Sequence, residues 1–283
     1  METWRIIFTQ TNNAFFNMAL DEALVVSCQE GSSPPLLRLY LWEPPAVSIG
    51  YFQSVEKAVS LKQCRDKGIH VVRRITGGRA VLHEEEITYS VCASSNYFHL
   101  LGGNTNQTYR RISMALLESL CALGVDGEWV KPSTDRKPTP SRSTSCRPCF
   151  MSNSRYEILV KGKKLIGSAQ RRFSFPSDDK RRDSFIQHGS ILTGEGRHSL
   201  AELLPEGSSA QVVKRSLHEK STNLESALGR RVDVEEVVSA LKKGFEEVFT
   251  CQVEDSRVSE RELQAARSLM EDKYLTGQWN LKR

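Results

Sequence analysis

The stretch from residue 73 to residue 83 constrains the fold of this chain more than any other. It reads Arg-Arg-Ile-Thr-Gly-Gly-Arg-Ala-Val-Leu-His and lies between two runs of strand-like composition, Ile69–Val72 and Ile87–Cys92. A Gly-Gly pair between strands lets the backbone approach a neighbour closely, because neither residue carries a Cβ. The stretch therefore predicts either a tight turn or one wall of a pocket, and both interpretations stay open at this point.

The composition is that of a soluble enzyme. The chain has 283 residues, of which 39% are hydrophobic and 26% are charged, and both fractions are ordinary for a globular protein. The sequence contains no apolar run of the ~20 residues needed to cross a bilayer. It also begins without a basic segment followed by an apolar one, so we expect a cytoplasmic protein with no secretory signal and no membrane partner.

Charge and cysteine content exclude two further classes of protein. The net charge is +5, and the densest cationic run, Lys180–Arg182, is flanked by Asp179 and Asp183. This is no basic stripe, so we expect no nucleic-acid partner, although a mildly basic surface suits an acidic protein. Seven cysteines, of which only Cys146 and Cys149 are close in sequence, do not form a secreted disulfide framework, and no second Cys or His pair accompanies them to make a zinc site.

Hydrophobic periodicity predicts an α+β fold with a sheet in the middle of the chain and helices at its end. Predicted strands cover Trp4–Phe8, Leu36–Trp42, Ala46–Gly50, Ile69–Val72, Ile87–Cys92 and Phe185–Leu192, and a hairpin joins Tyr156–Val160 to Lys164–Gln170. Predicted helices cover Asn13–Gln29, Ser60–Lys67, Thr108–Leu123, Leu200–Leu204, Ala210–Ser216, Val234–Phe249 and Glu260–Tyr274. Two polar loops are expected, at Lys131–Pro148 and at Arg171–Asp183.

Cys149 and Lys164 form a workable pair for acyl transfer. A thiolate exchanges one thioester for another at little thermodynamic cost, and a nearby ammonium lowers the pKa of the thiol. The same ammonium stabilises the oxyanion that develops on the acyl carbonyl. Plainer interpretations are a buried inert thiol or a redox pair for Cys149, an exposed strand lysine for Lys164, and a structural role for His188.

Two stretches resemble the signatures of the biotin/lipoate A/B protein ligase superfamily. The first is 73–83, and the second is Lys164–Gln170, whose lysine contacts the acyl carbonyl in that superfamily. Shorter matches at Asn17–Ala23, Gly50–Gln53 and Lys273–Asn280 extend the resemblance over nearly the whole chain. The resemblance implies a mixed sheet packed with helices, with a catalytic domain at 1–250 and a helical extension at 251–283 packed on the same domain.

Within the superfamily the chain resembles the LipM-type octanoyltransferases. Position 79 is Arg, where lipoate ligases tend to have a third glycine, and Cys149 precedes Phe150, where that subfamily has its catalytic cysteine. The resemblance then implies that Cys149 carries the acyl thioester, that Lys164 positions the acyl carbonyl, and that no metal or cofactor takes part. The implied substrate-binding residues are Arg73, Arg74, Thr76, Gly77, Gly78, Arg79, His83, Gly167, Ser168, Ala169, Gln170 and His188.

The implied partners are an acyl carrier protein as octanoyl donor and a lipoyl domain, such as the glycine cleavage H protein, as acceptor. Three alternatives remain: an ATP-dependent lipoate–protein ligase, an amidotransferase that moves octanoyl between lipoyl domains, and a catalytically silent binder of such domains. Glu84, where the signature is expected to have Asp, and the extra Cys146 depart from the pattern without removing a proposed catalytic residue.

Overall fold

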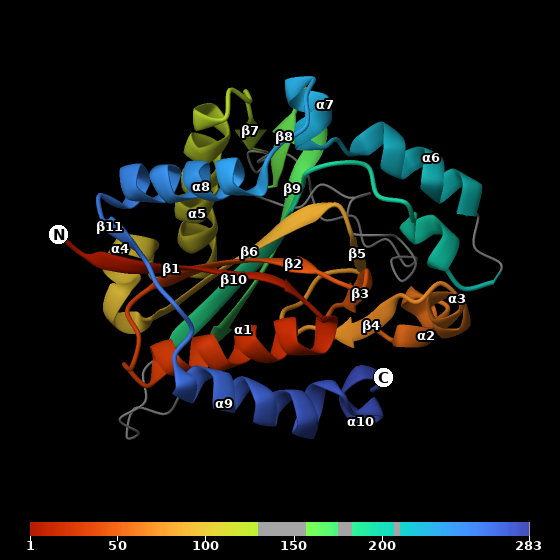
Figure 1. Ribbon diagram of the computed structural model, residues 1–283, viewed down its shortest axis with the longest axis horizontal. Helices are drawn as coiled ribbons and strands as arrows, with labels where there is room; N and C mark the ends of the chain where they lie inside the picture. The colour runs from red at the N-terminus through yellow and green to blue at the C-terminus, as the bar shows by residue number, and fades with distance from the viewer. Residues whose placement is uncertain (130–156, 175–182, 207–209, 283) are drawn as a thin grey trace.

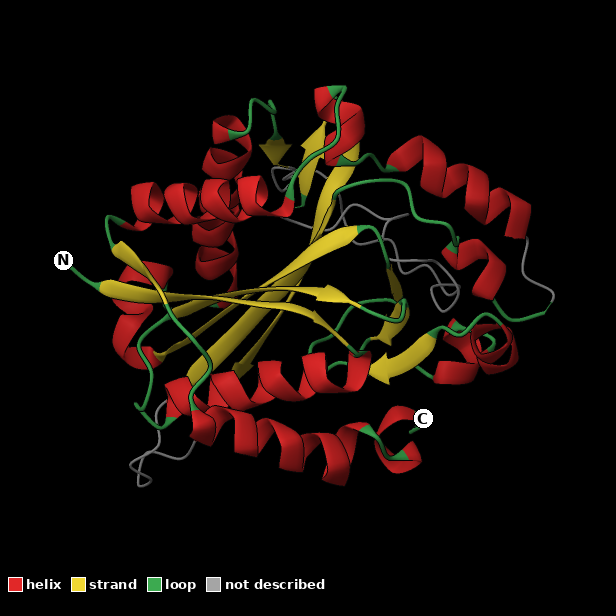
Figure 2. Cartoon of the chain, in the orientation of Figure 1, coloured by secondary structure: helices red, strands yellow, loops and turns green. Residues whose placement is uncertain are grey.

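Two β-sheets organise the chain, as seen in a computed structural model that describes residues 1–129, 157–174, 183–206 and 210–282. The large sheet has eight strands in the order β11-β1-β2-β6-β10-β9-β8-β7, and the small sheet has the order β4-β3-β5. Figure 1 shows the large sheet running through the centre of the molecule, with the small sheet beside one end of it. Helices cover both sides of the large sheet (Figure 2).

The strands of the large sheet are β1 (Thr3–Asn12), β2 (Leu36–Trp42), β6 (Glu86–Ser94), β7 (Glu128–Trp129), β8 (Ile158–Val160), β9 (Lys163–Phe173), β10 (Ser184–Leu192) and β11 (Gln252–Asp255). Those of the small sheet are β3 (Ala46–Ile49), β4 (His70–Arg73) and β5 (Val81–His83). The α-helices are α1 (Ala14–Gln29), α2 (Val55–Ala58), α3 (Leu61–Asp66), α4 (Phe98–Leu101), α5 (Thr105–Ala122), α6 (Ala210–Lys220), α7 (Leu224–Leu228), α8 (Val234–Phe249), α9 (Glu260–Leu269) and α10 (Gly277–Asn280).

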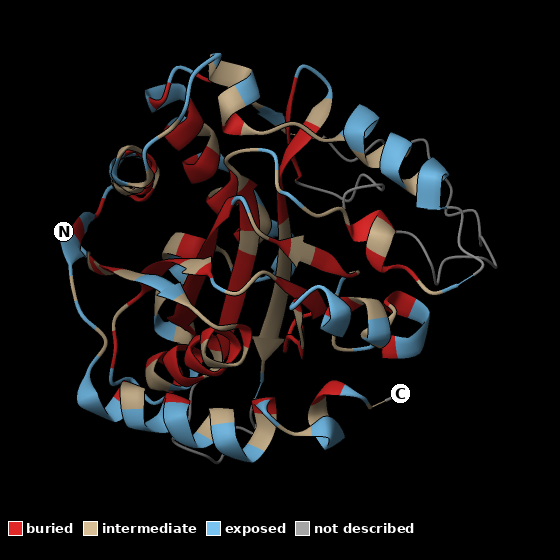
Figure 3. Cartoon of the chain, turned by 45° about the vertical axis from the view of Figure 1, so that its right-hand side comes forward, coloured by how far each residue is buried: buried red, intermediate tan, exposed pale blue. Residues whose placement is uncertain are grey.

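Strand β2 shows why the large sheet needs helices on both faces. Its side chains alternate between the two sides, with a period of two. Leu37 and Leu39 belong to the core under α5 and α8, whereas Leu36 and Tyr40 belong to the core under α1 and α9. A strand that is buried on both faces has a nearly continuous apolar sequence, as this one does. The strands and α1 are accordingly buried, while α6 and the outer side of α9 are exposed (Figure 3).

Helix α1 begins where its sequence provides a cap. The Asn13 side chain accepts a hydrogen bond from the Phe16 N–H, which satisfies one of the free donors at the start of the helix. The helix then lays Met18, Leu20 and Leu24 against the sheet. This packing matters for the site, because it also fixes the buried Asp21 against β2.

The sequence prediction of the fold class is confirmed, and most elements lie within a few residues of their predicted positions. Three differences stand out. Strand β5 lies inside the glycine-rich stretch, so the two predicted flanking strands belong to different sheets. The predicted loop at Arg171–Asp183 is wrong at its start, because β9 continues to Phe173 as the partner of β10. Strand β11 pairs in parallel with β1, whereas only helices were predicted after residue 250.

No helix in the described part of the chain is long and apolar enough to span a membrane.

A buried ion pair attaches α9 to the sheet. The Arg5 guanidinium donates to both carboxylate oxygens of Glu262, at 2.8 and 3.0 Å. The same carboxylate closes the capping box with Ser259 at the start of α9. Burial raises the pKa of Glu262, but Arg5 and Ser259 outweigh that effect and lower the pKa to about 2.

We predict that Glu262→Gln lowers the free energy of unfolding at pH 7 by roughly 2 kcal/mol, because it removes charged hydrogen bonds from a buried site. The pKa of Glu262 is depressed in the folded state, so its contribution is present above about pH 4.5 and is lost as the pH falls towards about 2. Urea unfolding from pH 7 to pH 3 measures both effects. Asp66→Asn, which breaks an exposed ion pair with Lys62, is the control and leaves the unfolding curve unchanged.

Candidate active site

A cavity of about 240 Å³ lies between the small sheet and the large one. Its walls come from α1, the end of β2, strands β3 and β5 of the small sheet, the glycine-rich turn, and the facing parts of β9 and β10, with Thr88 on β6 and Glu157 just before β8 completing them. Several predicted site residues line it, namely Arg74, Gly78, Arg79, His83, Gly167, Ser168, Ala169 and His188. Thr76, Gly77, Gln170, Arg73 and Lys164 lie outside this lining, and Cys149 lies outside the described residues.

The Gly-Gly corner is shaped by Arg74. Its guanidinium donates to the carbonyl oxygens of Ser48, Gly77 and Arg79, at 3.0, 2.8 and 2.8 Å. Gly78 has a φ of +96°, and a Cβ there would come within 2.6 Å of the Arg74 guanidinium. The corner therefore needs glycine at position 78 for its backbone conformation and for the space above it.

Arg73 has a different role from its neighbour. Its guanidinium is fully buried and donates to six backbone carbonyls. Three belong to Gly50, Tyr51 and Gln53, and three to Trp279, Asn280 and Lys282. Arg73 thus joins the loop after β3 to α10 and stabilises the back of the corner, rather than facing the cavity.

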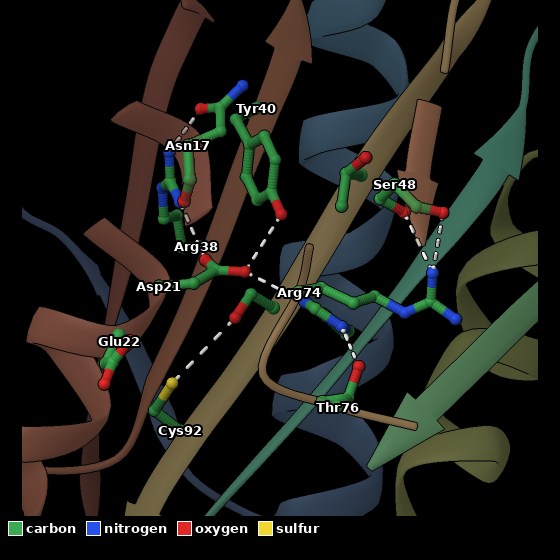
Figure 4. A network of polar contacts seen from close by, with 12 residues as sticks. Asn17, Asp21, Glu22, Arg38, Tyr40, Ser48, Arg74, Thr76 and Cys92 are labelled. Atoms are coloured by element: carbon green, nitrogen blue, oxygen red, sulfur yellow. Dashed lines mark hydrogen bonds and ion pairs between the residues drawn. The ribbon is translucent and has the colours of Figure 1, made fainter. Parts of the chain in front are cut away.

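A buried network connects α1 with the other side of the cavity (Figure 4). The Arg38 guanidinium donates to Asp21 at 2.7 Å, and the Tyr40 hydroxyl donates to the other oxygen of that carboxylate at 2.9 Å. Burial raises the pKa of Asp21, but Arg38 and His188 outweigh it and hold that pKa below its ordinary value. Asp21 is therefore the anionic centre of this network.

Asp21 fixes the orientation of His188, which lines the cavity. His188 Nδ1 lies 3.0 Å from Asp21, and Nε2 lies 2.6 Å from the Thr76 hydroxyl. Burial lowers the pKa of His188 despite the opposing effect of Asp21, so the ring is neutral at pH 7. Because Nδ1–H donates to the carboxylate, Nε2 accepts from Thr76. Thr76 therefore supports a cavity residue from behind and is not itself part of the lining.

His83 is held in a second network on the small-sheet side. Its Nδ1 lies 2.7 Å from Glu86, and its Nε2 lies 2.7 Å from the Ser48 hydroxyl. The imidazole also stacks on the Trp42 indole, with ring centroids 4.0 Å apart. All of these contacts fix the ring plane, so His83 forms a rigid part of the wall.

Lys164 lies directly behind the cavity wall. Its side chain is 1% exposed, and its ammonium donates to the Glu157 carboxylate at 2.5 Å. Glu157 lines the cavity. The hairpin of β8 and β9 brings the two residues together, because Lys164 pairs with Leu159 in its register. The site therefore has a buried cation and anion side by side next to the cavity.

A family model described as the lipoyl protein ligase A/B catalytic domain matches residues 13–246. This chain belongs to that family. The sequence expectation of the superfamily is thereby confirmed, and the match includes both signature stretches. In the chain, these signatures form facing walls of one cavity, the first through Gly78 and Arg79 and the second through 167–169.

Individual family members are similar over their full length. The chain is 39% identical over 285 residues to the octanoyltransferase LipM of Kyrpidia tusciae, covering 100% of both chains. It is 34% identical over 284 residues to LipM of Bacillus subtilis, covering 100% of this chain and 99% of the relative. A crystal structure of lipoate-protein ligase A bound with ATP matches with a TM-score of 0.78 at 27% identity, covering 99% of each chain.

Several site residues of this family member escaped the sequence prediction. Asp21, Tyr40, Trp42, Ser48 and Glu157 hold or line the cavity but were not predicted to be site residues. Asp21 carried a usable signal, since it lies in the stretch Asn17–Ala23 that matched the family pattern. Tyr40, Trp42 and Ser48 lie in strands whose apolar sequence gives no reason to separate them from core residues.

We predict that Gly78→Ala lowers the thermal unfolding midpoint, because a side chain at a positive φ is strained by about 1 kcal/mol and the new Cβ displaces Arg74. Differential scanning calorimetry measures the shift. Gly77→Ala is the matched control, since a Cβ there meets nothing within 4 Å, and it leaves the midpoint within about one degree. Equal midpoints for the two variants would contradict the strain and the close contact with Arg74 that the structure gives to position 78.

Proposed function

We propose that this chain is an octanoyltransferase of lipoate biosynthesis, moving octanoyl from an acyl carrier protein to a specific lysine of a lipoyl domain through a thioester on Cys149. The observation that carries the proposal is the full-length similarity to family members named octanoyltransferases. The site adds chemical support, because it places a cavity beside a buried lysine.

The first half-reaction is a thioester exchange. The Cys149 thiolate attacks the carbonyl carbon of the octanoyl thioester on the carrier, and a tetrahedral oxyanion forms. The carbon–sulfur bond to the carrier then breaks, and the carrier leaves as a thiolate that takes up a proton. One thioester replaces another, so this step is close to thermoneutral and needs no ATP.

The second half-reaction makes the product. The neutral amine of a lipoyl-domain lysine attacks the octanoyl–Cys149 carbonyl, an amide bond forms, and the Cys149 thiolate is released. The proton lost by the attacking nitrogen passes to solvent or to a group at the site. Because an amide is more stable than a thioester, this step drives the whole sequence forward. The glycine cleavage H protein is the acceptor we propose.

Lys164 supplies the positive charge at the reacting carbonyl in this proposal. A cation fixed in a dry site stabilises a developing oxyanion far more than one in water does. Lys164 is fixed in this sense, since it is buried and hydrogen-bonded to Glu157. Glu157 in turn lines the cavity, which brings the ion pair to the edge of the acyl-binding space.

The residues at the corner favour transfer over ATP-dependent ligation. Arg79 takes the place of a third glycine and puts a large side chain in the cavity wall. A cavity of about 240 Å³ is smaller than the pockets of ~300–1,000 Å³ that hold drug-sized ligands, and a cavity of this size suits an acyl chain. The ligase remains the second candidate, because an ATP-bound lipoate-protein ligase A shares the fold.

We predict that the chain gains one octanoyl group on incubation with octanoyl–acyl carrier protein in the absence of ATP. Intact-protein mass spectrometry detects the adduct, and peptide mapping places it on Cys149. Cys149→Ser abolishes the adduct and the transfer to H protein, whereas Cys146→Ser, the matched control three residues away, retains both. Activity that requires ATP and free lipoate would overturn the transferase proposal in favour of the ligase.

We predict that Lys164→Met slows acylation of Cys149 at least ~10²-fold, the usual effect of removing one positioned oxyanion donor. The variant leaves Glu157 buried without its cation, so the double variant Lys164→Met, Glu157→Leu serves to restore stability. We expect the double variant to unfold near the wild-type temperature and to stay slow. Lys163→Met, one residue earlier in β9, is the control and keeps wild-type rates; a fast double variant would refute the role of Lys164.

A further inference from the structure

A patch of aromatic rings and cations covers the surface next to the Gly-Gly corner. It consists of Tyr51, Phe52, Arg171, Trp279 and Lys282, and we call it the aromatic–cation patch. Phe52 is 86% exposed, and it is the most exposed aromatic side chain of the described residues. Exposed aromatic side chains next to an arginine have the composition of a protein–protein interface rather than of ordinary surface.

The patch is a built surface, because its members pack on each other. The Lys282 ammonium lies 3.9 Å from the Tyr51 ring centroid and 3.7 Å from that of Trp279. The Arg171 guanidinium lies 4.5 Å from the centroid of the same Tyr51 ring. Phe52 contacts Tyr51 edge-to-face, with centroids 4.8 Å apart. Cation–π contacts of this kind hold the charges in place on the surface.

Within the described part of the chain, the two cations of the patch, Lys282 and Arg171, contact aromatic rings and a carbonyl. Among the described residues, no ion pair joins Lys282 or Arg171 to a carboxylate, and the Arg171 guanidinium donates to the Ile75 carbonyl instead. The nearby Lys273 differs, because it forms an ion pair with Glu22 at 2.7 Å. Lys282 also lowers the pKa of the Tyr51 hydroxyl. The surface therefore complements an acidic partner.

The patch lies beside the mouth of the cavity. Gly78 lines the cavity and is also exposed to solvent, so the cavity opens there. Gly50 packs so closely on Gly78 that a Cβ at position 50 would lie 2.0 Å from the Gly78 carbonyl oxygen. The chain continues from Gly50 directly into Tyr51, whose N–H donates to the Thr76 carbonyl at 2.9 Å. Mouth and patch are thus parts of one rigid corner.

We infer that the aromatic–cation patch is the docking surface for the octanoyl donor, a carrier protein that presents an acidic face and holds its acyl group on a phosphopantetheine arm. This inference rests on the proposed function. A carrier with a long flexible arm can dock beside the mouth, whereas a lipoyl-domain lysine must come to the mouth itself. Phe52 inserts between side chains of the carrier, and Lys282 and Arg171 pair with its carboxylates, which also speeds the encounter.

The test compares two octanoyl donors that differ only in the presence of the carrier body. Acylation of the full chain is followed with octanoyl–acyl carrier protein and with octanoyl-N-acetylcysteamine, for wild type, Phe52→Ala and Lys282→Glu. We expect each variant to raise KM for the carrier about tenfold, which corresponds to ~1.4 kcal/mol, and to leave kcat within about twofold. Rates with the small thioester stay at the wild-type value.

Ionic strength and a distant charge reversal complete the test. Arg215→Glu reverses an 82% exposed cation on α6 and is expected to keep the wild-type KM for the carrier. Raising the salt concentration is expected to lower the wild-type kcat/KM for the carrier, because salt screens the attraction between the patch and the carrier. Lys282→Glu is expected to reduce this salt dependence. Circular dichroism and thermal melts verify that Phe52→Ala and Lys282→Glu are folded.

Two results overturn the docking assignment while leaving the proposed function intact. One is an unchanged KM for the carrier in both patch variants, and the other is a raised KM for the lipoyl domain alone, which would assign the patch to the acceptor. A wild-type chain that octanoyl–acyl carrier protein fails to acylate without ATP overturns the proposed function itself, and the docking assignment with it.

Discussion

The buried Arg73 guanidinium is the interaction on which the site depends. Its hydrogen bonds to six carbonyls join the loop 50–53 to residues 279–282, although these segments are far apart in sequence. Carbonyl groups cannot pair with each other, so the two segments could not meet in a buried place without a donor of this shape. Gly50 of this loop packs against Gly78 of the cavity wall, and Tyr51 and Phe52 belong to the aromatic–cation patch. One arginine therefore positions the inside and the outside of the corner.

Arg73 and Arg74 have different partners because neighbouring residues of an extended segment point to opposite sides. Arg73, the last residue of β4, faces α10, and Arg74 faces the cavity and the glycine turn. Cationic donors surrounded by carbonyls make a stiff frame, and the glycines let the backbone lie directly upon it. The outcome is a cavity wall that the chain's own hydrogen bonds hold in place. The two histidine rings are also fixed by hydrogen bonds, but to carboxylates: His188 to Asp21 and His83 to Glu86.

The sequence was a good guide to elements whose signal is local and a poor one to contacts made over long distances. Strand β2 and helix α8 have the predicted bounds, since alternation and a 3.6-residue period need no tertiary information. Strand β5 has three residues and β11 has four, too few to show a period, and both exist because a partner strand is available. Arg73, Arg74 and Thr76 lie in one motif, yet only Arg74 lines the cavity while the other two support it from behind. Their contacts with other elements determine this difference, and the sequence does not show those contacts. Lys164 was predicted from its motif, but its pairing with Glu157 required the register of the hairpin.

The pairing of β1 has a consequence for how the chain reaches this structure. Thr3 lies opposite Gln252 in the parallel ladder of β1 and β11, and Arg5 bonds to Glu262. Closing so long a loop costs conformational entropy before any contact compensates for it, and chains rich in such contacts fold slowly. The β1–β11 edge of the large sheet and the Arg73 hydrogen bonds to residues 279–282 both require closures of this kind. A chain that has completed α1, β2 and β6 without its C-terminal segment still lacks the partners through which Arg73 anchors the loop beside the cavity, so the corner is complete only when both ends of the chain are in place.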